Sequence, residues 1–494
     1  MTLLITGATG SIGSGLVERL ADTRPLRLLV RPAHPLTGKE RLARLLRGAA
    51  LERLEAGEIE VVEADLSLAG LGLDSEERRR LGARLTGIVH AAARTDFQGT
   101  RLSDYRDVNV QGAVHMAELA AQANCPLILL STAYVSGTHR GRFFEADQNL
   151  GQGHHNPYER SKLEAELAVL QVARRHRVPV AIFRPGVVLP DEPRPGIEVG
   201  PGPLVYLKLL AGLEGTRAAP ERELRYPGDP DGVLNLVGLP FVLRILTEAL
   251  DRPILDLRTY HLTASRPFCM EQIAAAMSRC LPGIRTVLRP PGELHEPDRY
   301  ERLLARRCRT YEPYLSLRTV HDRARLLAEF DGRDGADPRW LDGVFDRHLR
   351  YWNGRRAPVP ESCSHGRQVT DYFREFLPGM TGRLLVPGLR SLTADFTVSV
   401  LAQGSYRLRV ACGVLESVRP QERRGGDFDF EVDGASLLEA VGGQVKPAEL
   451  FFDRRIRIRG NLFEALSTAT ALEDFFELYP YRPSPAGTLA EVPR

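Results

Sequence analysis

A tyrosine and a lysine lie four residues apart in the stretch NPYERSKLEAE, residues 156–166. Residues four apart share one face of a helix, so Tyr158 and Lys162 are expected to point the same way. A tyrosine has a reference pKa of about 10 and needs a positive neighbour to act as acid and base near neutral pH. The pair therefore predicts a proton-transfer device, although the same spacing alone is common on solvated helix faces.

Two further polar residues come before this helix in the chain. Thr132 ends the apolar run PLILLST, where its hydroxyl could bind the same substrate oxygen as Tyr158. Asn109 lies in the preceding helical segment, suited to a water relay toward Lys162. The order of these residues favours a catalytic group over a chance pattern.

A glycine-rich turn, TGATGSIG, stands between the first apolar run and a helical segment. Gly7 permits a tight turn, Gly10 lets the backbone approach a pyrophosphate, and Gly13 lets helix and strand pack closely. The alternative is a simple turn between strand and helix. Its place at the head of an alternating series favours a dinucleotide site, for which the predicted contacts are Thr6, Gly7, Gly10, Ser11, Ile12 and Gly13.

The second apolar run is followed by Arg31, where NAD-preferring sites commonly carry an acidic residue for the ribose 2′-hydroxyl. A guanidinium can pair with a 2′-phosphate and stack on adenine, so NADP(H) is the predicted cofactor. The alternative is a surface arginine in an arginine-rich chain. Further predicted cofactor contacts at the ends of the third and fourth runs are Asp65, Leu66, Ala91, Ala92 and Ala93.

These residues need a parallel sheet to bring them together. Short apolar runs alternate with helical patterns, which is typical of an α/β fold with a Rossmann-type doubly wound parallel sheet. The six predicted strands lie at 2–7, 26–30, 59–66, 87–93, 126–132 and 178–186.

The composition and the apolar periodicity of the chain change after this core. We expect an NADP-binding domain at 1–285 with a substrate region at about 191–285, because Pro and Gly interrupt that part. Arginine-rich helical patterns predict a helical extension at 286–355, and a cluster of Pro, Gly and Ser predicts a linker at 356–367. Alternating strands then predict an α+β domain at 368–482 and a tail at 483–494.

The composition limits the classes of function. A length of 494 residues suggests two or three domains, and a net charge of +3 is too small to indicate nucleic acid as a partner. Six scattered cysteines show neither disulfide nor metal spacing, so no metal is expected. With no leader pattern and no apolar run near the roughly 20 residues of a membrane span, we expect a cytoplasmic protein without a transmembrane segment.

In order, the glycine turn, the HAAA strand, the Asn109 helix, the Thr132 strand and YxxxK resemble the extended short-chain dehydrogenase/reductases. The resemblance implies that Thr132, Tyr158 and Lys162 are catalytic with support from Asn109. It also implies that Tyr158 and Lys162 contact the cofactor. The strand FRPGVV is similar to the family strand that packs beside the nicotinamide, which adds the predicted contacts Pro185, Gly186 and Val188.

A narrower resemblance rests on the insertion at 33–58 and on the stretches ADLSLAGLGLDSEE, VHAAARTDF and STAYVSG. They look like the fatty acyl-CoA reductase and thioester reductase branch, the "male sterility" type, over about 1–270 and loosely over 285–350. This implies NADPH-dependent reduction of an acyl thioester, carried by CoA or an acyl-carrier protein, to an aldehyde and then an alcohol. The alternatives are a dehydrogenase of a hydrophobic alcohol or ketone, such as a steroid or isoprenoid, and a non-catalytic NADP-binding lipid carrier or sensor.

Residues 426–466 resemble the sterol carrier protein type 2 lipid-binding domain. The resemblance implies a hydrophobic ligand in the tail domain, held in a pocket with an apolar lining. The alternative is an ordinary α+β core whose role is oligomerisation, for example as a homodimer.

Overall fold

The computed structural model describes residues 2–33, 36–95, 101–194, 202–214, 222–252, 257–290, 292–354, 366–383, 392–421, 425–452 and 455–482. The chain divides into two compact units. Unit 1 comprises Met1–Leu207, Pro220–Glu296 and Ala305–His348, and unit 2 comprises Lys208–Ala219, Pro297–Leu304 and Leu349–Arg494. Most of the predicted linker at 356–367 and all of the predicted tail at 483–494 lie outside the described residues.

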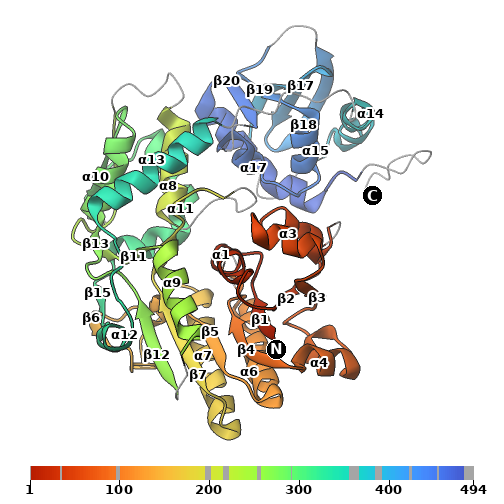
Figure 1. Cartoon of the computed structure of the whole chain (residues 1–494). Coiled ribbons are helices and arrows are strands. Elements are labelled where there is room, and N and C mark those ends of the chain that lie inside the picture. Colours follow the sequence, from red (N-terminus) through yellow and green to blue (C-terminus); the bar gives the residue numbers. More distant parts are fainter. Residues whose placement is uncertain are drawn as a thin grey trace. The chain divides into compact units, whose positions relative to one another are not determined.

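Unit 1 is built on a seven-stranded sheet whose neighbouring strands are all parallel (Figure 1). In spatial order its strands are β12 (Arg258–Leu262), β7 (Val180–Pro185), β5 (Leu127–Leu130), β4 (Leu85–His90), β1 (Thr2–Thr6), β2 (Leu26–Val30) and β3 (Glu60–Glu63). The strand order reverses between β1 and β4, so the carboxyl ends of these two strands flank the crevice in which open α/β sheets bind ligands. The predicted Rossmann-type α/β class is confirmed.

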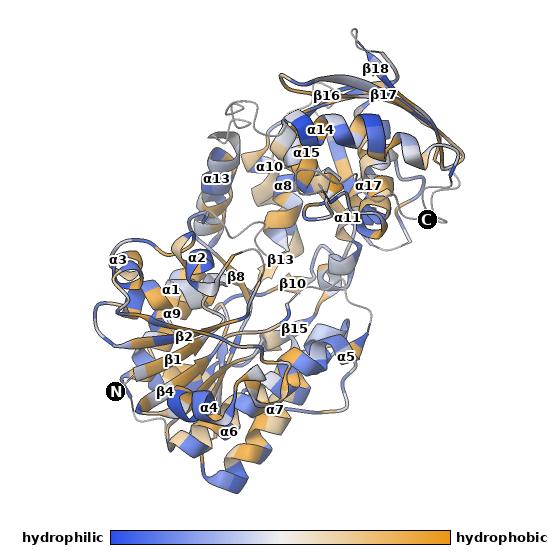
Figure 2. Cartoon of the chain, turned by 90° about the vertical axis from the view of Figure 1, so that its right-hand side faces the viewer, coloured by the Kyte–Doolittle hydropathy of each residue, from blue (hydrophilic) through white to orange (hydrophobic). Residues whose placement is uncertain are grey.

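Helices cover both faces of this sheet, as the βαβ pattern requires. The helices that share a core with one face are α1 (Ser11–Leu20), α2 (Gly38–Ala43), α3 (Ala49–Glu55), α9 (Leu239–Leu250) and α12 (Ala324–Glu329). Those of the other face are α4 (Ser75–Gly82), α6 (Gly112–Ala123) and α7 (Pro157–His176). In Figure 2, β1 is hydrophobic and α4 is largely hydrophilic, since α4 contributes Leu81 as its one buried residue.

The remaining elements of unit 1 include four two-stranded pairs. These pairs are β6 (Gly141–Phe143) with β15 (Thr319–His321), β8 (Val187–Leu189) with β11 (Leu236–Gly238), β9 (Arg222–Pro227) with β14 (Ile284–Arg289), and β10 (Val233–Leu234) with β13 (Phe268–Cys269). Further helices of the chain are α5 (Leu102–Tyr105), η2 (Arg106–Gln111), η3 (Ala133–Ser136), α8 (Pro203–Glu214), α10 (Met270–Cys280), α11 (Arg299–Cys308), η4 (Arg309–Ser316) and α13 (Pro338–Gly354).

Unit 2 has its own five-stranded sheet in the order β18 (Val414–Gln421), β17 (Gly404–Ala411), β16 (Ala394–Val400), β19 (Phe428–Val432) and β20 (Ile456–Gly460). Strands β16 and β19 are parallel and the other neighbours are antiparallel. Its helical elements are α14 (Gly366–Asp371), η5 (Tyr372–Phe376), η6 (Pro378–Met380), α15 (Gly434–Val441), α16 (Pro447–Phe452) and α17 (Leu462–Leu478). One apolar core joins sheet and helices, an α+β arrangement.

Among the described residues, no helix combines the length and the apolar character that crossing a bilayer requires.

Candidate functional site

A cavity of about 1030 Å³ lies in unit 1, with the carboxyl ends of β1, β4 and β5 on its wall. The predicted residues on its wall are spread over more than 180 positions of the sequence. The predicted residues that line it are Gly7, Gly10, Ser11, Ile12, Gly13, Arg31, Asp65, Leu66, Ala91, Ala92, Ala93, Thr132, Tyr158, Lys162, Pro185, Gly186 and Val188. Thr6 and Asn109 are not on its wall.

The glycine turn is shaped by close contacts that exclude side chains. A Cβ on Gly7, whose φ is +74°, would lie 2.6 Å from the backbone nitrogen of Ala92, and one on Gly13 would lie 2.1 Å from the carbonyl oxygen of Gly7. A Cβ on Gly10 would meet its nearest atom only at 3.4 Å, so Gly10 is spared for a ligand rather than for packing. Gly10 is also the N-cap of α1 and supplies no side-chain cap, which leaves the amides of the helix N-terminus for an anion. These features fit the pyrophosphate of a dinucleotide.

Thr6 lies behind the turn instead of facing the cavity. Its hydroxyl accepts a hydrogen bond from the amide of Ala92 at 3.1 Å and pairs with Nδ1 of His90 at 2.8 Å. Both Thr6 and His90 are fully buried. The side chain therefore ties β1 to β4 behind the turn, and a direct contact between Thr6 and the cofactor stays a prediction.

Two arginines line the part of the cavity beyond β2. Arg31 follows the strand and is exposed, and Arg41 on α2 donates a hydrogen bond from Nη1 to the carbonyl oxygen of Arg31 at 2.8 Å. Sequence reasoning missed Arg41 because no motif marks it. Its signal was a basic residue on the short helix directly after the second strand. Two guanidinium groups at this end of the cavity suit a phosphate group.

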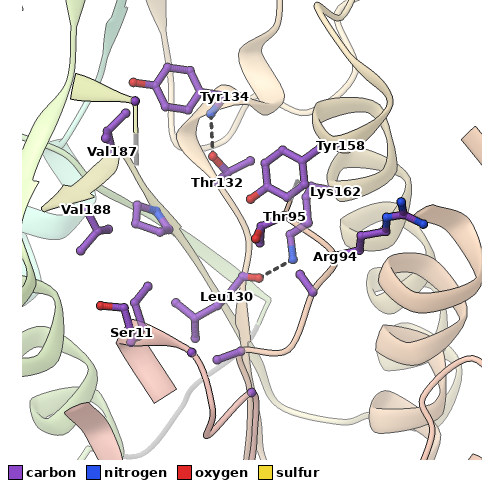
Figure 3. Close-up of a pocket in the computed structure, with 18 of the residues that line it drawn as sticks. Ser11, Arg94, Thr95, Leu130, Thr132, Tyr134, Tyr158, Lys162, Val187 and Val188 are labelled. Atoms are coloured by element: carbon purple, nitrogen blue, oxygen red, sulfur yellow. Dashed lines mark hydrogen bonds between the residues drawn. The ribbon is translucent and has the colours of Figure 1, made fainter. Parts of the chain in front are cut away.

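The catalytic candidates Thr132, Tyr158 and Lys162 lie apart from Ser11 of the glycine turn (Figure 3). Helix α7 starts at Pro157, and its N-cap Asn156 accepts a hydrogen bond from the amide of Glu159 at 3.0 Å, which places Tyr158 in the first turn. Lys162 is 3% exposed, and its Nζ donates a hydrogen bond to the carbonyl oxygen of Leu130 at 2.6 Å. Tyr158 and Lys162 therefore share the face of α7 that meets β5.

The protonation of this pair is set by desolvation. Burial lowers the pKa of Lys162 to about 8, partly opposed by the carboxylate of Glu166. Burial raises the pKa of Tyr158 to about 12, and the hydroxyl of Thr132 opposes that rise. The sequence led us to expect that Lys162 lowers the pKa of Tyr158. Desolvation is the largest influence on the pKa of Tyr158 and keeps the phenol a protonated donor, and the lowering by Lys162 stays a prediction.

Thr132 lies two residues after the end of β5, where it is the N-cap of the short helix η3. Its Oγ1 accepts a hydrogen bond from the backbone amide of Tyr134 at 3.2 Å. The hydroxyl of Thr132 also lies within hydrogen-bonding reach of Tyr158, whose pKa it lowers. Three groups thus face one space: a threonine hydroxyl, a tyrosine hydroxyl and a buried ammonium (Figure 3).

Asn109 lies in η2, a π-helical turn. Its Oδ1 accepts a hydrogen bond from the amide of Arg94 at 2.7 Å, and its Nδ2 donates to the carbonyl oxygen of Arg94 at 3.1 Å and to Oγ of Ser161 at 2.9 Å. The side chain therefore contacts the loop after β4 and α7, and the predicted water relay toward Lys162 stays a prediction. It holds the two walls of the site in register.

The cavity also has walls that the motifs did not reveal, and this part of it is called the chamber below. Its walls come from α8, β9, β10, α10, β14 and η4, and are largely apolar or aromatic. The chamber residues are Tyr206, Tyr226, Leu234, Met270, Ile273, Ala274, Met277, Leu288, Tyr311, Tyr314 and Leu315. Such a lining suits a hydrophobic molecule with its polar end toward Tyr158.

The chain is similar in sequence to a family of known proteins. Residues 5–222 match the male sterility protein family of NAD-binding domains. A Drosophila melanogaster protein whose name includes fatty acyl-CoA reductase is 26% identical over 323 residues, covering 54% of this chain and 60% of that protein. Fatty acyl-CoA reductase wat, of the same organism, is 25% identical over 223 residues, covering 38% of this chain and 43% of that protein. This chain thus spans less than two thirds of the length of either relative.

The chain is also similar to a solved structure. The terminal R domain from the myxalamid PKS-NRPS biosynthetic pathway superposes with a TM-score of 0.56 and 23% identity, covering 73% of this chain and 92% of that one. The likeness shows a shared fold that extends past residue 222. Within residues 5–222, which match the family model, the glycine turn fits the pyrophosphate of a nicotinamide dinucleotide.

Proposed function

We propose that this protein is an NADPH-dependent reductase of acyl thioesters. The observation that carries the proposal is a cavity that joins the Thr132, Tyr158 and Lys162 cluster to a chamber with an apolar and aromatic lining. Relatives named fatty acyl-CoA reductase support an acyl thioester as the substrate class. The pair of arginines beyond β2 supports a cofactor that carries a 2′-phosphate.

When bound, the reduced nicotinamide supplies a hydride to the thioester carbonyl carbon. Tyr158 donates its proton to the carbonyl oxygen as negative charge develops there, and Thr132 donates a second hydrogen bond. Lys162 stabilises the resulting tyrosinate, since its ammonium lies on the same helix face. Return of the proton to Tyr158 lets the carbonyl re-form as the C–S bond breaks, which gives an aldehyde and a thiolate. The thiolate then takes a proton from solvent to become the free thiol.

We propose that either CoA or an acyl-carrier protein carries the thioester and that reduction can continue from the aldehyde to the alcohol. CoA and an acyl-carrier protein present the same phosphopantetheine thioester, so one chamber serves both. A second hydride transfer to the aldehyde would use the same three side chains and give an alcohol. Asn109 acts as a positioning residue in either step.

The test is NADPH oxidation measured with acyl-CoAs, acyl-carrier proteins, aldehydes and hydrophobic ketones. We expect thioesters to be reduced and Tyr158→Phe to lower kcat/KM by at least about 100-fold. Tyr479→Phe, which changes a tyrosine of unit 2, is the matched control and should retain full activity. Turnover of ketones without any thioester would instead identify a dehydrogenase of hydrophobic alcohols.

Unit 2 is proposed to be a lipid-binding domain of the sterol carrier protein type 2 kind. A second cavity lies between its sheet and helices, lined by apolar and aromatic side chains such as Phe396, Leu450 and Phe475. Its volume of about 80 Å³ holds only a few methylene groups, whereas drug-sized ligand pockets measure about 300–1,000 Å³. A long chain therefore requires the helices to move apart.

Filling this cavity tests whether unit 2 binds lipid independently of the reductase activity. Ala469 lines the cavity and is 3% exposed, so Ala469→Phe should occupy the space. We expect this variant of the full chain to lose binding of a fluorescent fatty acid while NADPH oxidation with short thioesters is unchanged. Wild-type protein that binds no fatty acid would leave unit 2 a structural or oligomerisation domain.

A further inference from the structure

Helix α10 presents one face to the unit 1 cavity. Its residues on the cavity wall are Met270, Ile273, Ala274 and Met277. Positions three and four residues apart lie on the same side of a helix, and all four side chains are buried. None of the four is charged and none carries a hydroxyl or an amide. This face therefore suits an apolar part of a ligand.

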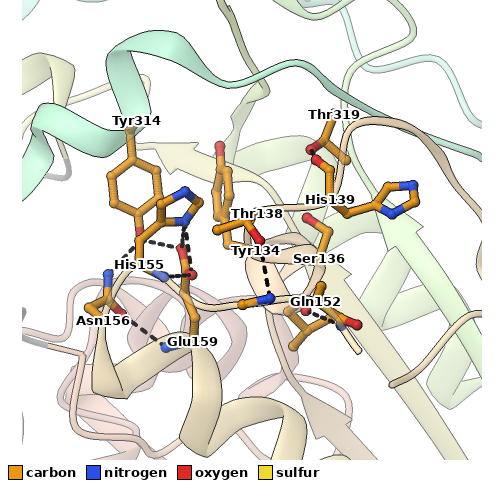
Figure 4. Close-up of polar contacts among 12 residues, drawn as sticks. Tyr134, Ser136, Thr138, His139, Gln152, His155, Asn156, Glu159, Tyr314 and Thr319 are labelled. Carbon is orange, nitrogen blue, oxygen red and sulfur yellow. Dashed lines mark hydrogen bonds and ion pairs between the residues drawn. The ribbon is translucent and has the colours of Figure 1, made fainter. Parts of the chain in front are cut away.

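A series of contacts along the cavity wall leads from Tyr158 to this face. Figure 4 shows the first step, in which the hydroxyl of Tyr314 in η4 donates to Oε1 of Glu159 at 2.6 Å and accepts from Nδ2 of Asn156 at 2.8 Å. Glu159 directly follows Tyr158 in α7, and its carboxylate also accepts the backbone amide of His155 at 2.8 Å. Tyr314, which lines the cavity, is therefore fixed against the first turn of α7.

The next residue of η4, Leu315, continues this wall to β14. Leu315 and Leu288 of β14 both line the cavity, and both pack around Gly228. A Cβ on Gly228 would lie 2.6 Å from Cδ2 of Leu288 and 3.1 Å from Cβ of Leu315. The wall is therefore apolar from η4 to β14.

A serine ties β14 to α10 at the position of Ala274. Oγ of Ser278 accepts the backbone amide of Thr286 at 2.9 Å and donates to the carbonyl oxygen of Ala274 at 3.0 Å. Thr286 lines the cavity, as Ala274 does. Along this wall, η4 and β14 therefore separate the α10 face from Tyr158.

Ala274 has the smallest side chain on the α10 face. The side chains of Met270, Ile273 and Met277 extend well past Cβ, whereas that of Ala274 ends there. The face is therefore recessed at Ala274, between Met270 one turn before it and Met277 about one turn after it. The size of the residue at position 274 determines how far a ligand can extend into this recess.

We propose that Ala274 determines the length of the acyl chain that the reductase accepts. The inference rests on the proposed thioester reductase function. With the thioester carbonyl at Tyr158, the chain extends past Tyr314 and Leu315 and ends against the α10 face. A larger residue at position 274 removes space for the last methylene groups and leaves the space beside Tyr158 unaltered. Each methylene group that loses its apolar surroundings lowers affinity roughly fourfold.

The test is kcat/KM of the full chain for butanoyl-, octanoyl- and hexadecanoyl-CoA with NADPH. We expect Ala274→Leu and Ala274→Phe to lower kcat/KM by about 10-fold or more for the longest ester that the wild type reduces, and to leave butanoyl-CoA unchanged. Met277→Ala enlarges the same recess and should shift the preference toward longer esters. Ala275→Phe changes the neighbouring residue, which is off the cavity wall, and is the matched control that should alter no ratio between esters.

Several results would overturn the inference. These are an equal loss for all three esters, unchanged ratios in folded Ala274 variants, and a wild type that reduces butanoyl-CoA alone, because its substrate would not reach α10. Wild-type protein that reduces no ester contradicts the proposed function instead. Melting temperatures verify that each variant is folded. If neither Ala274 variant folds, Met277→Ala decides the question, since it adds no bulk to the core, and an unshifted preference in that variant counts against the inference.

Discussion

The ammonium nitrogen of Lys162 lies 2.6 Å from the carbonyl oxygen of Leu130 and donates a hydrogen bond to it. This contact joins the face of α7 that carries Tyr158 to the end of β5, two residues before Thr132. A compact ammonium on a flexible stem fits such a buried position, whereas a planar guanidinium is larger and always charged. The lysine is therefore both an anchor for the site and its most readily titrated group.

The first prediction concerns the pH dependence of reduction. Because the pKa of Lys162 is lowered to about 8, the ammonium is present below that pH and lost above it, while Tyr158 stays protonated up to about 12. We expect kcat/KM for NADPH-dependent reduction to fall as pH rises through about 8. The profile is measured between about pH 6 and about pH 10. Lys162→Arg should be slower and should lack this inflection; a wild-type profile that is flat to about pH 10 would remove the role assigned to Lys162.

The second prediction is that Lys162 is needed for activity but lowers the free energy of unfolding. The pKa of Lys162 falls from an ordinary 10.5 to about 8 on folding, so the unfolded chain binds more protons between these values. Stability should rise with pH across that window, and the charged lysine should cost up to about 3 kcal/mol at neutral pH. Lys162→Met should therefore abolish turnover and raise the free energy of unfolding by about 1–3 kcal/mol, partly offset by the lost bond to Leu130. Denaturant unfolding at about pH 7 and about pH 10 checks both signs.

Two glycines of the same turn should respond differently to alanine. Gly13→Ala would bring a Cβ within 2.1 Å of the Gly7 carbonyl oxygen, so we expect a loss of about 2–4 kcal/mol or failure to fold. Gly10 has φ −95° and ψ 170°, which alanine adopts freely, and its Cβ would stand 3.4 Å from the nearest atom. Gly10→Ala should fold normally yet bind NADPH at least about 10-fold more weakly, because its methyl group blocks the pyrophosphate. Equal cofactor affinity in Gly10→Ala and wild type would contradict a dinucleotide at this turn.

The preference for NADPH is predicted to depend on two arginines. Arg31→Ala and Arg41→Ala should each raise the KM for NADPH by about 10- to 100-fold and leave the KM for NADH nearly unchanged. Arg47→Ala removes an exposed arginine that does not line the cavity and is the matched control. If both coenzymes were affected alike, the arginines would be acting on the fold rather than on a 2′-phosphate.

The sequence predicted those parts of the fold that local patterns dictate. Six strands of the central sheet appear as apolar runs, and the glycine turn marks its own strand and helix, because both signals reside in a few consecutive residues. The seventh strand, β12, was missed since RTYHL has little apolar periodicity and gains its place by pairing with β7. Its burial is a consequence of tertiary packing.

The site residues likewise include some that local sequence patterns predict and others that only the tertiary structure brings to the site. Tyr158 and Lys162 could be predicted because helical spacing brings them together, and Thr132 because it ends an apolar run. Arg41 and Tyr134 were not assigned to the site, because only the three-dimensional path of the chain brings them to the cavity wall. Asn109 was found as a polar residue in the right segment, but its partners Arg94 and Ser161 depend on how η2 packs against α7.

The last prediction concerns a buried ion pair one turn beyond Lys162. Arg184 on β7 donates from Nε and Nη2 to the two carboxylate oxygens of Glu166 at 2.9 and 2.6 Å, and both side chains are fully buried. Arg184→Met leaves the carboxylate buried without its partner, so we expect a loss of about 3–5 kcal/mol. The double variant Arg184→Met with Glu166→Met should lose much less, because it buries no unpaired charge.

The same pair should act on the pH profile, because the Glu166 carboxylate favours the charged form of Lys162. Removing Arg184 frees that carboxylate and should move the inflection above about 8. Removing both residues takes away the negative charge and should move the inflection below it. Unfolding free energies and pH profiles of wild type and both variants test this together. An inflection that stays in place while stability changes would limit the pair to holding β7 against α7.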